Sequence, residues 1–421
     1  MPTGLATVNL GGDYRRSHLA GYREEYRYAD GSLARPPSLW ADRVLQRYSV
    51  FGEIRAPVLP ARLLPAFLRA FNSDLALRYV GANSAKESYL APTLGLKVDL
   101  ANGFSFRGSF TTSSRYPTPQ LNKPVSAPPT SGGVVTPYTE QITDPLRGGQ
   151  QYSVGVTEVP NPGLLPESAL TQAFGVLFQR GKIHRLRATL DFVDTHKTNE
   201  EIFVGSGTAV SLEKYFPERV LRAPLAAGDP NTAGVITSVL TGRTNLAWRH
   251  SQNWNGSVDY AWTKCHGGTL ELYGRLLYFE LYQRQILPGA EPVDEIALPA
   301  SAESGLLRYR ANFGAGWSNR DFGFGVDGRY YSPRVLPVDQ WAVQGHDRIR
   351  PAWQFDAYVE SDLGRWLPWD QSRHGLRAQL RVNNVFGERF PKYLSEPSGA
   401  GVQPYGDWRG RTYSFSLNAE Y

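Results

Sequence analysis

The stretch Gly410–Tyr421, which reads GRTYSFSLNAEY, decides the fold class of this chain. From Tyr413 onward every second residue is apolar or small, and these residues are Tyr413, Phe415, Leu417, Ala419 and Tyr421. The residues between them are polar. A period of two gives an extended strand one apolar face and one polar face. Together with the aromatic last residue, this pattern is typical of a membrane barrel, which has an apolar outer face and aromatic side chains at the interface.

The same two-residue rhythm recurs along the chain in pairs of strands joined by tight turns. Residues 94–100 and 104–110 alternate on either side of Asn102-Gly103, and Asn-Gly between alternating runs is a strong hairpin signal. Similar turns are expected near 180–182, 266–268 and 319–321. About fourteen strands of roughly ten residues are predicted, which is long enough for a tilted crossing of the apolar layer. The even number places both ends of the chain on the short-turn side.

Long connections rich in Pro, Gly, Ser and Thr alternate with the tight turns. They lie near residues 116–168, 197–241, 286–304, 333–351 and 388–409. We therefore expect long extracellular loops at one end of the strands and short periplasmic turns at the other. Residues Val58–Phe71 break the rhythm with an interrupted helical spacing, and we interpret them as an elaborated periplasmic turn. The predicted fold class is all-β, a transmembrane antiparallel β-barrel.

Composition agrees with a barrel and excludes other classes. Among 421 residues there are 23 Tyr, 19 Phe and 10 Trp, yet no run of about 18 apolar residues that could form a transmembrane helix. The single Cys265 excludes a disulfide within the chain and a cysteine-based metal site. The net charge of +6 comes from dispersed arginines, so nucleic acid is not an expected partner. The start of the chain has neither the basic nor the apolar region of a signal peptide.

No motif in the sequence requires catalysis. Gly323–Gly328 fits G-x-G-x-x-G, but a dinucleotide site needs a strand before the glycines and a helix after them. Here the glycines fall inside an alternating strand, so we interpret them as small residues on its inner face. The seven histidines have no chelating spacing, and no nucleophile signature is present. We predict that the protein is not an enzyme and has no metal site and no cofactor.

The polar side of the strands carries many charges. At mid-depth on a lipid-facing surface each arginine costs about 2–4 kcal/mol, so these side chains are expected to face a water-filled or protein-filled interior. They could line a solute path, hold a plug domain or form a charge ladder between strands. The predicted lumen-facing residues are Arg185, Arg187, Arg308, Arg310, Asp327, Arg329, Asp356, Glu360, Arg377 and Arg381.

Several short motifs resemble those of one family. The stretch Val382–Gly387 (VNNVFG), followed by Arg389-Phe-Pro391 and by Gly410-Arg411-Thr-Tyr413, resembles the C-terminal strands of TonB-dependent outer-membrane receptors. Asn161–Glu167 (NPGLLPE) and Tyr48–Glu53 (YSVFGE) are similar to segments found earlier in those barrels. Each motif is weak by itself, but their order and spacing match over nearly the whole chain.

The resemblance implies a location and a set of partners. It places the chain in the cell outer membrane, in contact with lipid and with the barrel-assembly machinery, for which the terminal strand is the signal. It also implies that extracellular loops, here those near 116–168 and 197–241, capture a ligand that the sequence does not identify. A plug domain then rearranges under the action of the TonB complex.

The resemblance also implies missing parts. Such receptors carry a signal peptide, a TonB box, a plug and about 22 strands. We therefore expect residues 1–421 to be the C-terminal portion of the barrel, from a truncated or split reading frame, with plug, TonB box and signal peptide absent. Coupling to TonB would then be impossible unless the plug is supplied elsewhere.

Two alternatives remain open at this point. A complete, smaller porin-like barrel could act as a passive channel, and it would have to close at about fourteen strands because lipid does not tolerate open sheet edges. Stable pores in a planar bilayer would favour this alternative. A soluble β-rich binding protein is the third class, and recovery of monomer without detergent would support it.

Overall fold

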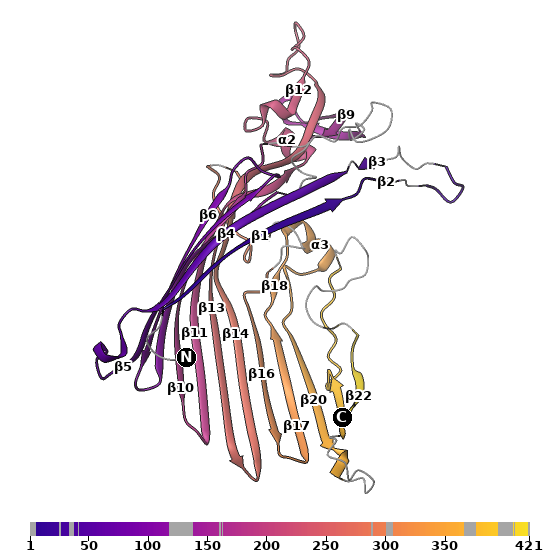
Figure 1. The fold of residues 1–421 in the computed structure, drawn as a ribbon. Helices are drawn as coiled ribbons and strands as arrows, with labels where there is room; N and C mark the ends of the chain where they lie inside the picture. The colour runs from indigo at the N-terminus through magenta and orange to yellow at the C-terminus, as the bar shows by residue number, and fades with distance from the viewer. Residues whose placement is uncertain are drawn as a thin grey trace.

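The main element is one antiparallel sheet in which each long strand pairs with the next along the chain (Figure 1). The computed structural model describes residues 6–24, 27–32, 38–40, 42–117, 138–159, 161, 163–287, 289–299, 306–365, 376–394, 407 and 409–419. Among the described residues, fourteen strands of the sheet pair in chain order, and they are β1 (Thr7–Leu19), β4 (Arg43–Pro57), β5 (Leu68–Ala82), β6 (Tyr89–Leu100), β7 (Phe104–Arg115), β10 (Glu167–Arg180), β11 (His184–Val204), β13 (Ile236–Cys265), β14 (Gly268–Gln285), β16 (Tyr309–Ser318), β17 (Phe322–Tyr331), β20 (Ala352–Asp362), β21 (Leu376–Asn383) and β22 (Thr412–Ala419). Four shorter strands, described below, add to its edges and ends. The predicted all-β antiparallel architecture is confirmed.

The sheet curves strongly, and β1 and β22 are its outermost strands (Figure 1). Strand β1 pairs with β4, and β22 pairs with β21. In the part of the chain that the structure describes, the two outermost strands do not pair with each other. No described helix is long and apolar enough to cross a membrane.

The predicted hairpin at Asn102-Gly103 is confirmed in register and in turn geometry. Asp99 lies opposite Ser105 across the turn. Gly103 has a φ of 95°, which is the left-handed region that glycine adopts most readily. The Asn102 side chain accepts a hydrogen bond of 3.3 Å from the Phe104 backbone N–H. The Asn-Gly pair therefore reverses the chain between β6 and β7.

The central strands are much longer than the predicted ten residues. Strand β13 has 30 residues, β11 has 21 and β14 has 18. The predicted loop boundaries near 197–241 are therefore wrong, because Val204 still lies opposite Gly242 in the paired ends of β11 and β13. At the other end, residues 58–67 join β4 to β5 through a short 3-10 helix, η1 (Ala61–Leu63), in agreement with an elaborated turn. The predicted turn extends too far, because residues 68–71 already belong to β5. The connection 83–88 is short although it lies at the loop end, so the predicted strict alternation fails there.

Two of the predicted loops fold into a small domain, which we call the cap (residues 138–159 and 205–241) (Figure 1). It contains β8 (Tyr138–Asp144), η2 (Pro145–Arg147), β9 (Gln150–Glu158), α2 (Ser206–Ser211), η3 (Pro217–Arg219) and β12 (Val220–Arg222). Strand β9 runs parallel to the first residues of β13. Buried apolar side chains of the cap and of the adjoining ends of β11 and β13 form one hydrophobic core. This core includes Ile142, Val154, Val156, Val204, Val210, Phe216 and Val239.

The remaining elements are short and lie in the connections. They are β2 (Tyr22–Glu24), β3 (Ser38–Trp40), β15 (Val293–Asp294), β18 (Arg334–Val335), η4 (Val338–Gln340), α3 (Trp341–Gln344), β19 (Arg348–Ile349) and η5 (Leu363–Arg365). Strand β2 pairs with β3, and β18 pairs with β19.

Candidate functional site

One face of the sheet is apolar and is bounded by two rows of aromatic side chains. Aromatic side chains on consecutive strands form the row nearer the long loops, which consists of Phe192, Trp254, Tyr278, Tyr309, Tyr330 and Trp353. All are register neighbours except Tyr309 and Tyr330, whose rings lie diagonally, 5.5 Å apart. The rings of Tyr330 and Trp353 lie 4.3 Å apart. Nearer the short turns a second row contains Trp262, Trp317 and Phe324. Exposed apolar side chains, such as Val258, lie between the two rows.

The spacing of the two rows is close to the height of the apolar layer of an outer membrane. Trp254 and Trp262 are eight residues apart on β13, which corresponds to about 26 Å along a strand and to about 20 Å of height for a strand tilted by about 35–45°. The apolar band of a membrane barrel is about 25 Å tall and is flanked by aromatic girdles. Beyond Phe192, the same side of β11 carries Asp194, which accepts a hydrogen bond from Gln252. The apolar face therefore ends at the loop-side girdle.

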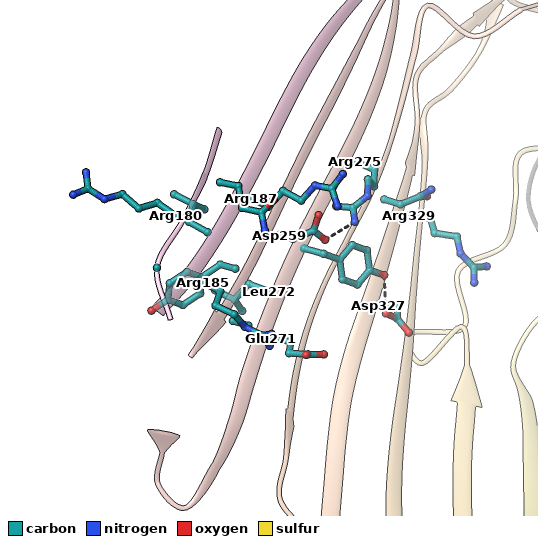
Figure 2. Close-up of a pocket in the computed structure, with 16 residues that line it drawn as sticks. Arg180, Arg185, Arg187, Asp259, Glu271, Leu272, Arg275, Asp327 and Arg329 are labelled. Atoms are coloured by element: carbon teal, nitrogen blue, oxygen red, sulfur yellow. Dashed lines mark hydrogen bonds and ion pairs between the residues drawn. The ribbon is translucent and has the colours of Figure 1, made fainter. Parts of the chain in front are cut away.

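The opposite face contains a polar hollow of about 760 Å³, which we call the wall hollow. Its charged and polar lining includes Arg185, Arg187, Asp259, Glu271, Tyr273, Arg275, Asp327 and Arg329, contributed by β11, β13, β14 and β17 (Figure 2). Arg275 pairs with Asp259, and the Tyr273 hydroxyl donates a hydrogen bond of 2.7 Å to Asp327. Arg180 points away from this group.

Glycines on the polar face allow side chains two strands apart to meet. Arg107 on β7 donates hydrogen bonds of 2.8 and 2.6 Å to Asp191 on β11. Gly175 of β10 lies directly between them in the register. A Cβ atom at Gly175 would lie 1.8 Å from an oxygen of Asp191, so only glycine leaves room for this ion pair.

We expect Gly175→Ala to lower the free energy of unfolding by about 1–3 kcal/mol, because the added methyl group displaces Asp191 from Arg107. Urea unfolding of the chain in neutral detergent measures the change. Gly256→Ala is the matched control, since its new Cβ would make only an ordinary 3.9 Å contact with Leu276. Equal stability of the two variants would contradict the proposed packing role of Gly175.

The glycine motif of β17 also leaves room for large side chains of neighbouring strands, and it is not a dinucleotide site. Gly325 lies beneath the ring of Tyr358, where a Cβ atom would come within 2.6 Å of it. Gly323 is likewise buried on the polar face. Gly328 lies instead beneath the ring of Phe313 on the apolar face, so the interpretation of all three glycines as inner-face residues is wrong for this one. Its position follows from the two-residue period of the strand.

Nine of the ten charged residues predicted to face a lumen occupy strand positions on the polar face, and several pair across strands. Arg329 lies 3.0 Å from Asp356, Arg381 3.6 Å from Asp327, and Arg377 3.7 Å from Glu360. These pairs form part of the charge ladder that was one of the open interpretations. That the face borders a water-filled interior stays a prediction.

Four of the predicted arginines differ from the ladder residues. Arg308 lies one residue before β16, and its guanidinium lies 3.2 Å from Asp294 in the connection after β14. That Arg308 faces a lumen stays a prediction. Arg185, Arg187 and Arg310, by contrast, make no ion pair with any residue that the structure describes. Arg185 and Arg187 line the wall hollow with free guanidinium groups.

The terminal strand has the predicted faces as far as it is described. Tyr413, Phe415 and Leu417 are exposed on one side of β22, which pairs with β21. Ala419 is the last residue of the strand, and Tyr421 lies outside the described residues.

The VNNVFG motif forms a buried polar junction that the sequence analysis did not identify as such. Asp356 is only 2% exposed and accepts hydrogen bonds from the Asn384 backbone N–H (2.8 Å) and from Gln354 (3.1 Å). Asn384 has a φ of 55°, which asparagine tolerates better than most residues. Its side chain donates to the Glu388 carbonyl and accepts from the Glu388 N–H. The motif therefore ends β21 and anchors the following loop to β20.

The cap contains a buried ion triad that no sequence motif indicated. Arg222 lies 2.7 Å from both Asp144 and Glu213, and Tyr152 donates a 2.6 Å hydrogen bond to Asp144. The Asp144 side chain is fully buried. Burial raises the pKa of Asp144, but hydrogen bonds from Arg222 and Tyr152 outweigh it, so the pKa lies below its usual value. Nearby, the Asn231 backbone N–H and Arg147 lower the pKa of Asp229 to about 2.

We expect the cap to loosen as the pH falls below about 4. The folded-state pKa of Asp144 lies below the unfolded value of about 3.9, so its stabilisation is complete at higher pH and is lost as protonation removes the charge. Hydrogen exchange of β8 and β9, followed against pH, measures this opening. In Asp144→Asn the acid-dependent step should shrink, and an unchanged step would show that other carboxylates cause it.

Comparison with known proteins gives the family and the fold. Residues 2–385 match the family described as "TonB dependent receptor-like, beta-barrel". A mutant of the ferric enterobactin receptor PfeA from Pseudomonas aeruginosa is similar in structure, with a TM-score of 0.62 and 16% identity over 98% of this chain and 51% of that one. No curated protein matches the sequence.

Two further structures share the architecture. The siderophore receptor PirA from Acinetobacter baumannii has a TM-score of 0.54 at 12% identity and covers 99% of this chain and 60% of its own. The copper transporter OprC has a TM-score of 0.53 at 13% identity, and the match covers 98% of this chain and 54% of OprC. The chain thus spans about half the length of the solved structures that it resembles.

The family match carries consequences for location and chemistry. Its members are receptors and transporters of the Gram-negative outer membrane and are not enzymes, which confirms the predicted location and the predicted lack of catalysis. It also confirms the resemblance found in the sequence motifs. Since the match extends over residues 2–385, the chain belongs to the TonB-dependent receptor β-barrel family.

Proposed function

We propose that this chain forms the C-terminal part of the barrel of an outer-membrane uptake receptor. The open sheet is the observation that carries the proposal. Strands β1 and β22 each pair on one side only within the described residues. Lipid does not tolerate unpaired backbone groups, so further strands must complete the wall. We propose that another polypeptide segment supplies these strands, together with the plug on which coupling to TonB depends.

We propose a scarce metal or its chelate as the ligand class. The similar structures are named for ferric enterobactin, a siderophore and copper, which supports this class without identifying one member. Within the complete receptor, the polar face of this chain would border the plug and the solute path. The free Arg185 and Arg187 of the wall hollow are then available to either of them.

We also propose that the cap takes part in first contact with the ligand, as expected for the loops from which it forms. Its hydrophobic core and its ion triad support a preformed surface, in contrast to a pair of flexible loops. A preformed surface loses less conformational freedom on binding.

Planar-bilayer recordings of the purified chain test the proposal. A barrel portion with two open edges should give no stable, uniform conductance steps. The porin alternative predicts such steps, because a closed wall of fourteen strands would surround a permanent pore. Stable steps from the chain alone would therefore overturn the proposal. Cysteines introduced by Leu10→Cys on β1 and Phe415→Cys on β22 provide a second test, since efficient crosslinking between them would indicate closure.

A further inference from the structure

A second hollow lies between two connections at the loop end of the sheet, and we call it the loop hollow. Its lining comes from residues 333–351, between β17 and β20, and from residues 389–394, after β21. Its volume is about 790 Å³, within the range of about 300–1,000 Å³ typical of small-molecule sites. Neither connection belongs to the cap.

The two connections hold each other in place, so the loop hollow is preformed. Tyr393 is 2% exposed and packs with Leu336 and Ile349 in a small core. The Gln344 side chain donates a 3.0 Å hydrogen bond to the Lys392 carbonyl. The same side chain accepts one of 2.9 Å from the Leu394 backbone N–H.

The lining combines positive charge with apolar surface. Its charged and titratable residues are His346, Asp347, Arg348, Arg350, Arg389 and Lys392, so one acid faces four permanent cations. Arg348 is occupied by Asp347 at 2.7 Å, and Arg350 lies 3.7 Å from Glu388. The side chains of Arg389 and Lys392 form no ion pair within the described part of the chain.

Apolar groups complete the wall of the loop hollow, and they come from Pro333, Ile349, Pro351, Phe390, Pro391 and Leu394. The Phe390 ring lies 5.8 Å from that of Tyr331, the last residue of β17. Tyr331 alternates in step with Asp327 and Arg329, so it belongs to the polar face. The loop hollow therefore lies at the loop end of the proposed solute path and not on the lipid-facing side.

We infer that the loop hollow binds a small solute that carries several anionic groups on a flat apolar or aromatic body. Free guanidinium and ammonium groups satisfy the anions with charge-assisted hydrogen bonds, and Phe390 and the prolines contact the apolar part. This inference rests on the proposed uptake function, and it names the chemical class that one site of the receptor recognises.

Fluorescence anisotropy of pyrene tetrasulfonate, titrated with the full chain in neutral detergent, tests the inference. We expect saturable binding that weakens with salt, and no binding of a cationic pyrene of the same size. The double variant Arg389→Gln/Lys392→Gln should weaken binding at least about tenfold, because it removes two charge-assisted contacts. Arg62→Gln/Lys182→Gln makes the same charge change at exposed positions in two short turns, at the opposite end of the strands, and should leave the affinity unchanged.

Three results would overturn the inference. They are a folded chain that does not bind the probe, equal losses in the two double variants, and displacement of the probe by lipopolysaccharide at lower concentrations than by free citrate. The last result would assign the cations to a lipid headgroup. Circular dichroism confirms the strand content of each variant first. The binding assay needs neither a plug nor a closed wall, so a failure to bind the probe would leave the proposed uptake function standing. Conversely, stable pores in the planar-bilayer test would overturn the proposed function without changing the result of the binding assay.

Discussion

Arg222→Met is expected to destabilise the cap by about 3–5 kcal/mol, the usual effect of removing one partner from a buried ion pair. Asp144 is fully buried and receives two of its hydrogen bonds from Arg222. Without the guanidinium, Asp144 and Glu213 would be left close together and unpaired. Hydrogen exchange of β8, β9 and β12 measures the loss, and these strands should exchange faster by two orders of magnitude or more.

Lys214→Met is the matched control, because it makes the same substitution of charge on the exposed surface of the cap. Surface charges of this kind contribute about 0–1 kcal/mol, so exchange in the cap should change little. Exchange within β16 and β17 should be unaffected in both variants, since the triad lies in the cap alone. Equal exchange rates for Arg222→Met and Lys214→Met would refute the claim that the triad holds the cap together.

Val258→Arg is expected to lower the unfolding free energy in lipid vesicles by about 2–4 kcal/mol. Val258 is exposed on the apolar face, midway between Trp254 and Trp262. An arginine there would have to leave water for the middle of the apolar layer. Urea titration in vesicles of the receptor with its missing strands supplied measures the difference, and the yield of folded receptor in the membrane should fall with it.

Ser257→Arg introduces the same side chain at the same depth but on the polar face, where Ser257 hydrogen-bonds Thr189 at 2.6 Å. We expect a much smaller loss, because a guanidinium on this side keeps contact with water or with polar groups. A larger loss for Ser257→Arg than for Val258→Arg would reverse the assignment of the two faces. The membrane orientation of the whole sheet depends on this one comparison.

Local sequence predicted the hairpins and the two faces of the strands well. Asn102-Gly103 and the turn at Asn319 form tight reversals because their side chains and backbone conformations satisfy the turn by themselves. The alternation of Tyr413, Phe415 and Leu417 likewise needs only the period of a strand. The family resemblance was readable from VNNVFG, although the role of Asn384 in binding Asp356 was not.

The lengths of the central strands and the cap were not predictable in the same way. Residues 197–204 and 236–241 look like loop sequence because their polar and small side chains break the apolar alternation. They become strands because the cap packs a hydrophobic core against them. Arg222, Asp144 and Glu213 are far apart in sequence, and no spacing rule connects them.

Side-chain alternation and turn chemistry act between residues close together in the chain, so the amino-acid sequence alone predicts membrane-spanning antiparallel strands. The folded molecule was needed to learn which charges meet, such as Arg107 with Asp191 across Gly175, and where the cap and the two hollows form. These contacts depend on strand register and on the packing of distant connections, which local patterns do not specify.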